Sequence, residues 1–164
     1  MTTGELIVNL EELLAREAIR KTMAKYNISG DRLKVEDYVS CFTEDGVMEA
    51  SSAPGTVDFR YAGRDEIRAW QNRWRNREPG KASVHEASFV RHHLSTSMID
   101  LTGPNTASAR TYWVAWSDIG PDHSGYYLDT FRKVGDEWLI AHRQARMDWT
   151  SPDSLFGTAV ENSR

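Results

Sequence analysis

The spacing of the apolar residues changes at Pro79-Gly80, from the period of about 3.6 typical of helices to the period of two typical of strands. Before this point, one helical face carries Leu10, Leu13, Leu14, Ala18, Ile19, Thr22, Met23 and Tyr26. Asn9 and Glu12 resemble a capping box at the start of that helix, and Ser29-Gly30 predicts its end, with the glycine in a left-handed turn. After this point, alternation predicts strands over 88–101, 106–118, 125–134 and 137–149.

Two further helices are predicted before the change of period. The first carries Val35, Tyr38, Val39 and Phe42 on one face and stops at Glu44-Asp45-Gly46, after which 47–50 reads as a short strand. The second opens at Gly63 with acidic residues in its first turn, and Pro79-Gly80 closes it. Its apolar face is formed by Ile67, Trp70 and Trp74.

Helices that come first and strands that come last indicate an α+β fold rather than alternating βαβ units. The four long strands are joined by turn sequences at 102–105, 120–125 and 134–136, so they form an antiparallel meander. We expect a curved, mostly antiparallel sheet that packs on three N-terminal helices as a cone and encloses a hydrophobic pocket. Residues 1–150 form one domain, and the tail 151–164 is either disordered or docks Leu155-Phe156 on a neighbour.

Composition excludes several classes of function. Twenty basic and 24 acidic residues give a net charge of −4, which argues against a nucleic acid or an anionic membrane as partner. Cys41 is the only cysteine, so no internal disulfide and no multi-cysteine metal site can form. The chain lacks an 18-residue apolar run, and its first residues do not resemble a secretory signal, so we expect a cytoplasmic protein without membrane contact.

Sequence motifs of cofactor-dependent enzymes are absent. The chain contains no G-x-x-x-x-G-K-[ST], G-x-G-x-x-G, G-x-S-x-G or H-E-x-x-H. This argues against a nucleotide-driven reaction, a dinucleotide cofactor, an α/β-hydrolase triad and a zincin. We therefore predict chemistry carried by a few side chains in a pocket, without a cofactor or metal.

The order of several short motifs resembles the SnoaL-like branch of the NTF2-like superfamily, whose fold is the cystatin-like cone. The matching segments begin at Tyr26-x4-Asp31 and include 42–47, 63–67, 91–95, 125–132 and 135–143, and the match ends at Met147-Asp148-Trp149. The resemblance covers nearly the whole chain. It implies the fold more specifically than the reaction, because this fold hosts lyases, isomerases, cyclases, dioxygenase small subunits and binding proteins.

Within that superfamily the sequence is most similar to scytalone dehydratases and hexachlorocyclohexane dehydrochlorinases. Both resemblances imply a catalytic pair, here Asp31 after the first helix and His92 on the first long strand. A carboxylate bonded to one imidazole nitrogen fixes the tautomer and leaves the other nitrogen to accept a proton. The alternative for Asp31 is a turn aspartate that bonds to backbone amides.

The chain also departs from these patterns. Gly30 and Ala50 stand where the dehydratase has tyrosines, and its second histidine falls on Ser117. Ketosteroid isomerases offer a second resemblance, in which Tyr26 and Asp129 match the oxyanion-binding pair but Ala50 takes the place of the aspartate base. An Asp129 paired with Arg132 or Arg110 on the sheet is the alternative.

The remaining candidate ligand-binding residues are aromatic or small. Tyr26 or Tyr127 would stabilise a developing oxyanion, while Trp70, Trp113, Ser117 and Asp129 line the pocket, with core packing as the alternative for Trp70. His92 and His93 point to opposite faces of one strand, and the family match selects His92. We interpret His85, His123 and His142 as structural.

A metal site is the alternative to a catalytic Asp31–His92 pair. Asp31, His85, His92 and His93 are the candidate ligands, but no two have the spacing that lets one element present two ligands. The helix with Arg68, Arg73, Arg75, Arg77, Asn72 and Asn76 indicates a solvated face or a subunit contact.

The preferred hypothesis is a lyase, such as a dehydratase, that abstracts a proton from a small apolar cyclic or aromatic substrate. The alternatives are an isomerase or cyclase, and a non-catalytic binding or accessory subunit similar to those of ring-hydroxylating dioxygenases. Tyr112, Val114 and Trp116 alternate with Trp113 and Ser117, which predicts an apolar outer patch and a homodimer or homotrimer.

Overall fold

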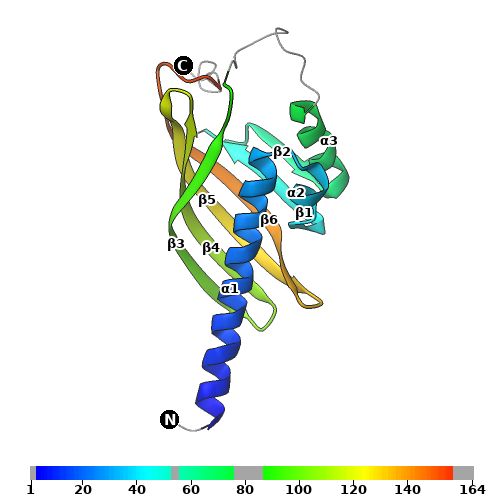
Figure 1. Ribbon diagram of the computed structural model, residues 1–164. Helices are drawn as coiled ribbons and strands as arrows, with labels where there is room; N and C mark the ends of the chain where they lie inside the picture. Colours follow the sequence, from blue (N-terminus) through cyan, green and yellow to red (C-terminus); the bar gives the residue numbers. More distant parts are fainter. Residues whose placement is uncertain (1–2, 53–55, 76–86, 157–164) are drawn as a thin grey trace.

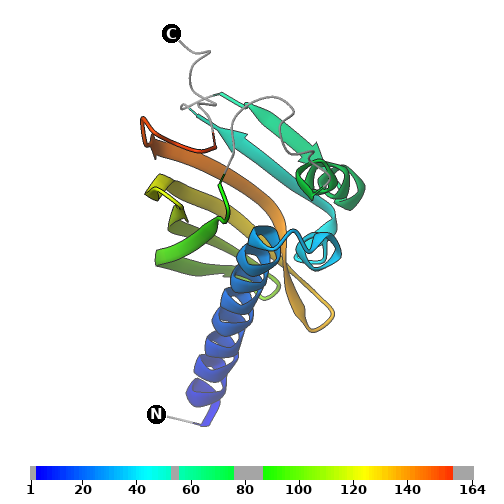
Figure 2. The same ribbon diagram turned by 45° about the horizontal axis from the view of Figure 1, so that its top comes forward.

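The computed structural model describes residues 3–52, 56–75 and 87–156. A long helix, α1 (Thr3–Asp31), crosses one face of a curved sheet, and its N-terminal part extends past the sheet (Figures 1 and 2). The short α2 (Val35–Val39) and α3 (Arg64–Arg75) lie together at one end of the sheet (Figure 1). None of the described helices is long and apolar enough to cross a membrane.

The sheet has six strands in the order β2-β1-β6-β5-β4-β3. Their bounds are β1 Phe42–Ser51, β2 Phe59–Ala62, β3 Arg91–Gly103, β4 Thr106–Ser117, β5 Gly120–Val134 and β6 Glu137–Thr150. Strands β3 to β6 form the predicted antiparallel meander, and only β1 and β6 pair in parallel. The predicted α+β cone with a curved, mostly antiparallel sheet is therefore confirmed.

The end of α1 differs from the prediction. Gly30 is helical, and Leu33 takes the left-handed conformation at φ 53°. A Cβ on Gly30 would lie 3.1 Å from the ring of Tyr38, so the glycine allows Tyr38 to pack against the helix. The helix also begins before Asn9, and Leu10, Leu13 and Leu14 are exposed because this part of α1 lies beyond the sheet.

Two predicted turns are parts of strands. Residues 44–46 lie within β1, where the pairing with β6 is interrupted between Phe42 and Val47, so the turn residues form an irregularity in the strand. Residues 120–125 belong to β5, because Gly120 at φ 92° already pairs with Ser117 across a tight hairpin. Strand β2 was not predicted, and the closing of α3 at Pro79-Gly80 lies outside the described residues.

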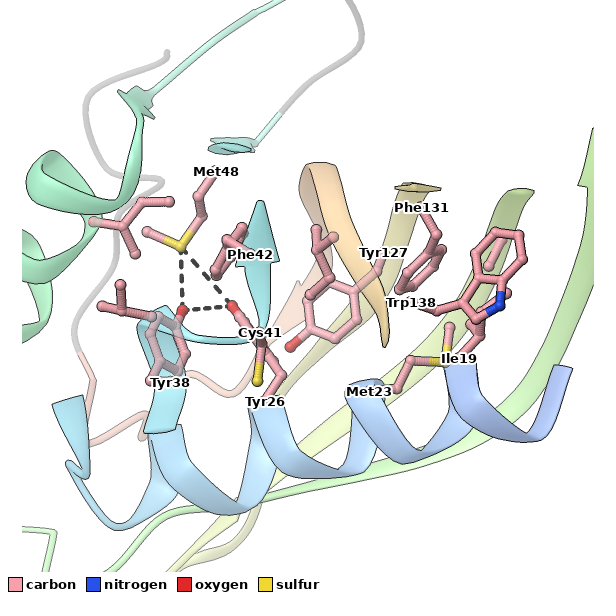
Figure 3. Packing of buried hydrophobic residues seen from close by; sticks show 14 of the residues in the cluster. Ile19, Met23, Tyr26, Tyr38, Cys41, Phe42, Met48, Tyr127, Phe131 and Trp138 are labelled. Atoms are coloured by element: carbon pink, nitrogen blue, oxygen red, sulfur yellow. Dashed lines mark hydrogen bonds between the residues drawn. The ribbon is translucent and has the colours of Figure 1, made fainter. Parts of the chain in front are cut away.

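The core fills the space between α1 and the sheet with large side chains. Ile19, Met23 and Tyr26 of α1 pack with Phe131 and Trp138 of the sheet (Figure 3). Burial of such side chains contributes roughly 1.5–3 kcal/mol each. The apolar face of α1 thus fixes where its C-terminal residue, Asp31, meets the sheet.

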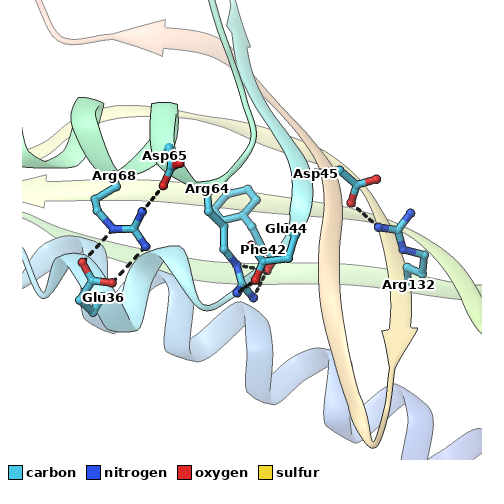
Figure 4. Close-up of polar contacts among 8 residues, drawn as sticks. All are labelled: Glu36, Phe42, Glu44, Asp45, Arg64, Asp65, Arg68 and Arg132. Carbon is cyan, nitrogen blue, oxygen red and sulfur yellow. Dashed lines mark hydrogen bonds and ion pairs between the residues drawn. The ribbon is translucent and has the colours of Figure 1, made fainter.

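Ion pairs attach α3 to its surroundings (Figure 4). Arg68 contacts Glu36 of α2 at 2.9 Å and Asp65 at 2.6 Å, and Arg64 donates to the backbone oxygen of Phe42 at 2.9 Å. Arg73 donates to the Tyr61 hydroxyl. These described arginines therefore stabilise the packing of α3, while Asn76 and Arg77 lie outside the described residues.

Candidate active site

The structure brings Asp31 and His92 together although 61 positions separate them. Asp31 is the last residue of α1, and His92 lies at the start of β3. Asp31 Oδ1 lies 2.6 Å from His92 Nδ1, and Asp31 Oδ2 accepts the backbone N–H of His92 at 2.9 Å. The aspartate side chain is 7% exposed and the histidine side chain 26%. A carboxylate accepts hydrogen bonds, so Nδ1 carries the proton and Nε2 is a free acceptor.

The position of β3 in the sheet explains the backbone bond. β3 is an edge strand, so one side of its backbone lacks a strand partner, and the Asp31 carboxylate satisfies the His92 N–H. The turn after α1 is closed by its own backbone bonds, from Leu33 N–H to Gly30 and from Lys34 N–H to Ser29. Asp31 is therefore not needed to cap that turn.

Aromatic side chains form a wall beside this pair. The His92 ring lies 5.8 Å from the Trp113 ring, which stacks on Tyr127 at 5.6 Å. Tyr26 contacts Tyr127 edge to face at 6.1 Å and extends the wall toward the core. The predicted lining residues Tyr26, Trp113 and Tyr127 thus lie in one continuous cluster on the helix side of the sheet.

Trp70 lies at the other end of this cluster. Its ring contacts Tyr38, Phe59 and Tyr61 at 6.0–6.2 Å, and no described contact joins it to His92. Tyr38 donates a hydrogen bond to the Tyr26 hydroxyl at 2.6 Å. Burial raises the pKa of both phenols above the ordinary value, which keeps them protonated.

Asp129 pairs with Arg143 rather than with Arg132 or Arg110. The two residues lie directly opposite each other on β5 and β6, and their side chains form hydrogen bonds of 2.6 and 2.8 Å. Arg132 and Arg110 are exposed, because alternation turns them to the outer face. Burial lowers the pKa of the Arg143 guanidinium, but the Asp129 carboxylate outweighs this effect and the pKa is raised. Asp129 is thus the ion-pair partner of Arg143 and not the oxyanion-binding residue that the ketosteroid isomerase resemblance implied.

Ser117 belongs to a second aspartate–histidine pair that the sequence interpretation missed. Ser117 Oγ donates to Asp122 Oδ2 at 2.9 Å, and Asp122 Oδ1 lies 2.8 Å from His123 Nδ1. The His123 ring lies 6.0 Å from His92 and 5.6 Å from Trp113. His123 therefore lies next to the candidate site. His123 is four residues before Tyr127, so the two side chains share one face of β5. The sequence could have indicated this, but residues 120–125 were interpreted as a turn.

A β-bulge creates this second pair. Ala115 pairs with His123 and Trp116 with Pro121, so Asp122 is an extra residue in β5. Such a bulge re-aims side chains, and here both Asp122 and its neighbour His123 are buried. Two adjacent residues of a regular strand would point to opposite faces.

The first residues of the C-terminal tail dock on the same pair. Ser154 Oγ and the Leu155 N–H donate to the Asp122 carboxylate at 2.6 and 3.0 Å, and the Phe156 ring lies 5.4 Å from His123. Leu155-Phe156 thus packs on its own chain, while 157–164 lie outside the described residues. Burial raises the pKa of Asp122, but the hydrogen bonds from Ser154, His123, Leu155 and Ser117 outweigh it and lower the pKa to about 2.

A hollow lies on the opposite side of the sheet from α1. It has a volume of about 320 Å³, and outward-facing residues such as Met98, Arg110, Leu128 and His142 line it. Its lining includes neither Asp31 nor His92, and the aromatic core packs between α1 and the sheet.

The other histidines do not join the site. His93 is exposed and lies 6.2 Å from Trp116 on the outer face, and His142 contacts Glu49 at 3.2 Å. His85 lies outside the described residues. Among the residues that the structure describes, no group of three histidine, cysteine or acidic side chains could hold a metal ion.

Solved structures with the same fold include enzymes and an enzyme subunit. A candidate scytalone dehydratase from Novosphingobium aromaticivorans superposes with a TM-score of 0.68 at 26% identity, over 87% of this chain and 90% of that one. The beta subunit of a candidate aromatic-ring-hydroxylating dioxygenase from the same species gives 0.71 at 18% identity, over 90% and 97%. A hexachlorocyclohexane dehydrochlorinase from Novosphingobium barchaimii gives 0.67 at 13% identity, over 87% and 92%.

No functionally curated protein matches the chain by sequence. The sequence profile of the SnoaL-like domain matches residues 11–144, which include most of α1, the Asp31–His92 pair and most of the sheet. This match spans most of the chain, and the structural neighbours share the NTF2-like, cystatin-like fold. The chain therefore belongs to the SnoaL-like domain family.

Proposed function

We propose that the chain is a cofactor-free lyase in which His92 abstracts a proton from a small cyclic or aromatic substrate. The observation that carries the proposal is the double contact of Asp31 with His92. It fixes both the ring and its tautomer and leaves Nε2 as a proton acceptor at a partly exposed position. The buried rings of Trp113 and Tyr127 give the His92 ring apolar surroundings on the helix side of the sheet.

The reaction that fits this arrangement is an elimination. His92 Nε2 takes a proton from an acidic C–H, the electron pair of that bond forms C=C, and the bond to the leaving group breaks with its pair. A halide departs as the anion. A hydroxyl group takes a proton from the imidazolium and departs as water. The names of two structural neighbours, a candidate scytalone dehydratase and a hexachlorocyclohexane dehydrochlorinase, correspond to these two variants and support the reaction class.

The test is turnover of a panel of cyclic substrates that carry a hydroxyl or a halogen next to an acidic C–H. We expect His92→Gln to lower the rate at least about 100-fold, as loss of a general base does. His93→Gln is the matched control, because His93 is the next residue but faces outward. Its rate should stay within about twofold of wild type, as expected for a surface substitution. Equal rates in wild type and His92→Gln would refute the proposal.

A second candidate function is an accessory subunit. The similarity to a dioxygenase beta subunit favours it, as does the position of the 320 Å³ hollow away from His92. In that case Asp31–His92 is a structural hydrogen bond. Co-purification of a large partner subunit, together with the absence of turnover on the panel, would support this function instead of the lyase.

A further inference from the structure

His92 and His123 form a pair of imidazoles with matching chemistry. Each ring has its Nδ1 held by a carboxylate, by Asp31 at 2.6 Å and by Asp122 at 2.8 Å. The rings lie 6.0 Å apart at 78°, and both contact the Trp113 ring. In the part of the chain that the structure describes, no hydrogen bond occupies Nε2 of either ring.

The support under His123 is more extensive than a structural histidine needs. Asp122 is fully buried, and its carboxylate accepts hydrogen bonds from Ser117, Ser154 and the Leu155 N–H besides its contact with His123. An ionised carboxylate in the interior is costly unless several donors satisfy it, and here three segments of the chain supply them. The result is one fixed tautomer, with the proton on Nδ1 and a lone pair on Nε2.

We propose that His123 is a specificity-determining residue that accepts a hydrogen bond from a hydroxyl group of the ligand. The ligand class is a hydroxylated ring, phenolic or alicyclic. This inference rests on the proposed function in one respect: it places the ligand in the same site, beside His92. The ring would lie against Trp113, with its O–H toward His123 and its reacting C–H toward His92.

The charges around His123 favour a neutral ring whose Nε2 accepts a hydrogen bond. The titratable groups that face His123 are Asp122 on its own strand and His92 on β3, while Trp113 and Phe156 are uncharged. Burial lowers the pKa of the His123 imidazole and the nearby His92 lowers it further, against the raising effect of Asp122. The net pKa is lowered, so His123 is neutral at pH 7 and its Nε2 accepts.

The positioning residues are Asp122 and Ser154. They act through His123 rather than on the ligand, since Asp122 fixes its tautomer and Ser154 bonds to the far side of the carboxylate. The C-terminal segment 151–156 is thus part of the ligand site, and Phe156 covers the His123 ring at 5.4 Å.

The test compares the binding of 2-naphthol with that of its methyl ether by titration calorimetry on the full chain at pH 7.5. The two probes share one ring system, and only naphthol can donate an O–H. We expect wild type to bind naphthol about tenfold more tightly, since a site built to accept a hydroxyl donor rejects the analogue that lacks it. His123→Phe should remove the preference, while His93→Phe, on the outer face, should retain it.

Asp122→Asn is a second variant that keeps the shape of the site. Its amide N–H faces Nδ1, which moves the ring proton to Nε2 and turns the acceptor into a donor. Both probes carry an oxygen that can accept from Nε2, so their affinities should become equal. His92→Gln should keep the preference for naphthol, which separates this inference from the lyase proposal. Equal affinities in wild type, a preference that survives His123→Phe, or no binding of either probe at millimolar concentration would overturn the inference.

Discussion

Asp31 bonds to His92 twice, once at the backbone N–H and once at the ring Nδ1. Both groups are donors, so both contacts require an oxygen on the aspartate side. The first prediction follows from this requirement. Asp31→Asn can place an oxygen toward one donor only, and its amide N–H then faces the other.

If the amide N–H faces the ring, the proton moves to Nε2 and His92 can no longer accept one. We expect Asp31→Asn to lower turnover at least about 100-fold, within the usual contribution of general base catalysis. Nitrogen-15 NMR of the His92 ring measures the tautomer directly. The same tautomer in wild type and Asp31→Asn would contradict the prediction.

The second prediction concerns acid stability. The folded-state pKa of Asp122 is about 2, against about 3.9 in an unfolded chain, so the unfolded state binds more protons between these values. The carboxylate thus contributes its full stabilisation above about pH 4 and loses it as the pH falls toward 2. The shift corresponds to about 2–3 kcal/mol.

Urea unfolding of wild type from pH 5 to pH 2 measures this loss. Asp122→Asn should show a shallower decline of the unfolding free energy over the same range. Asp153→Asn, an exposed residue in the same segment, is the control and should follow wild type. Identical pH profiles for Asp122→Asn and wild type would show that the carboxylate is not held as described.

The third prediction concerns the buried ion pair of Asp129 and Arg143. The Arg143 guanidinium carbon lies 4.0 Å from the ring centroids of both Tyr26 and Tyr127. Arg143→Met leaves the Asp129 carboxylate buried without its partner, which should cost about 3–5 kcal/mol of unfolding free energy.

The double variant Asp129→Leu/Arg143→Met removes the stranded charge, so it should be more stable than Arg143→Met alone. Chemical denaturation of both variants and of Asp129→Leu completes the cycle. Additive losses in the double variant would mean that the two side chains do not interact.

The fourth prediction concerns Gly125, which lies where the pairing of β5 with β6 shifts register. A Cβ at this position would overlap the carbonyl oxygen of Arg146, a backbone atom that cannot move aside. Gly125→Ala should therefore destabilise the fold by about 3 kcal/mol or more. Gly135→Asn is the comparison, because that residue lies in an open turn at φ 61°, which asparagine tolerates. Thermal unfolding should show the larger loss for Gly125→Ala.

The fifth prediction is self-association through the outer face of the sheet. Tyr112 and Trp116 are 43% and 41% exposed, and Met98 and Leu128 add apolar area on the neighbouring strands. A two-fold interface needs one self-complementary patch, and this face has the required apolar character. Light scattering should give a dimer or trimer, and Trp116→Glu should shift it toward the monomer. Leu13→Glu, on α1, is the control; a monomeric wild type would refute the prediction.

Much of the fold could be predicted because local patterns and tertiary packing agree. The alternation in 106–117 matches a strand with one buried face, and the Asp31–His92 contact was inferred from a family resemblance. The end of α1 was misread because the space that Tyr38 needs beside Gly30 is a tertiary effect. No local signal reports such a contact.

The second histidine was missed for a different reason. Gly120, Pro121 and Gly125 are turn residues by local preference, yet pairing with β4 and β6 extends the strand through them. The burial of Asp122 also depends on Ser154 and Leu155, which are more than 30 positions away. An isolated Asp-His dipeptide carries no sign of such partners.

Because Asp122 is an extra residue in β5, the support of His123 could be removed without changing the rest of the fold. Deleting that single position would restore a regular ladder between β4 and β5 without disturbing the hydrophobic core around α1. The shortened chain would keep its fold and the Asp31–His92 pair, but the support of His123 would be lost. A one-residue change in strand length is therefore a route by which this scaffold could gain or lose a ligand preference, with no need to redesign its interior.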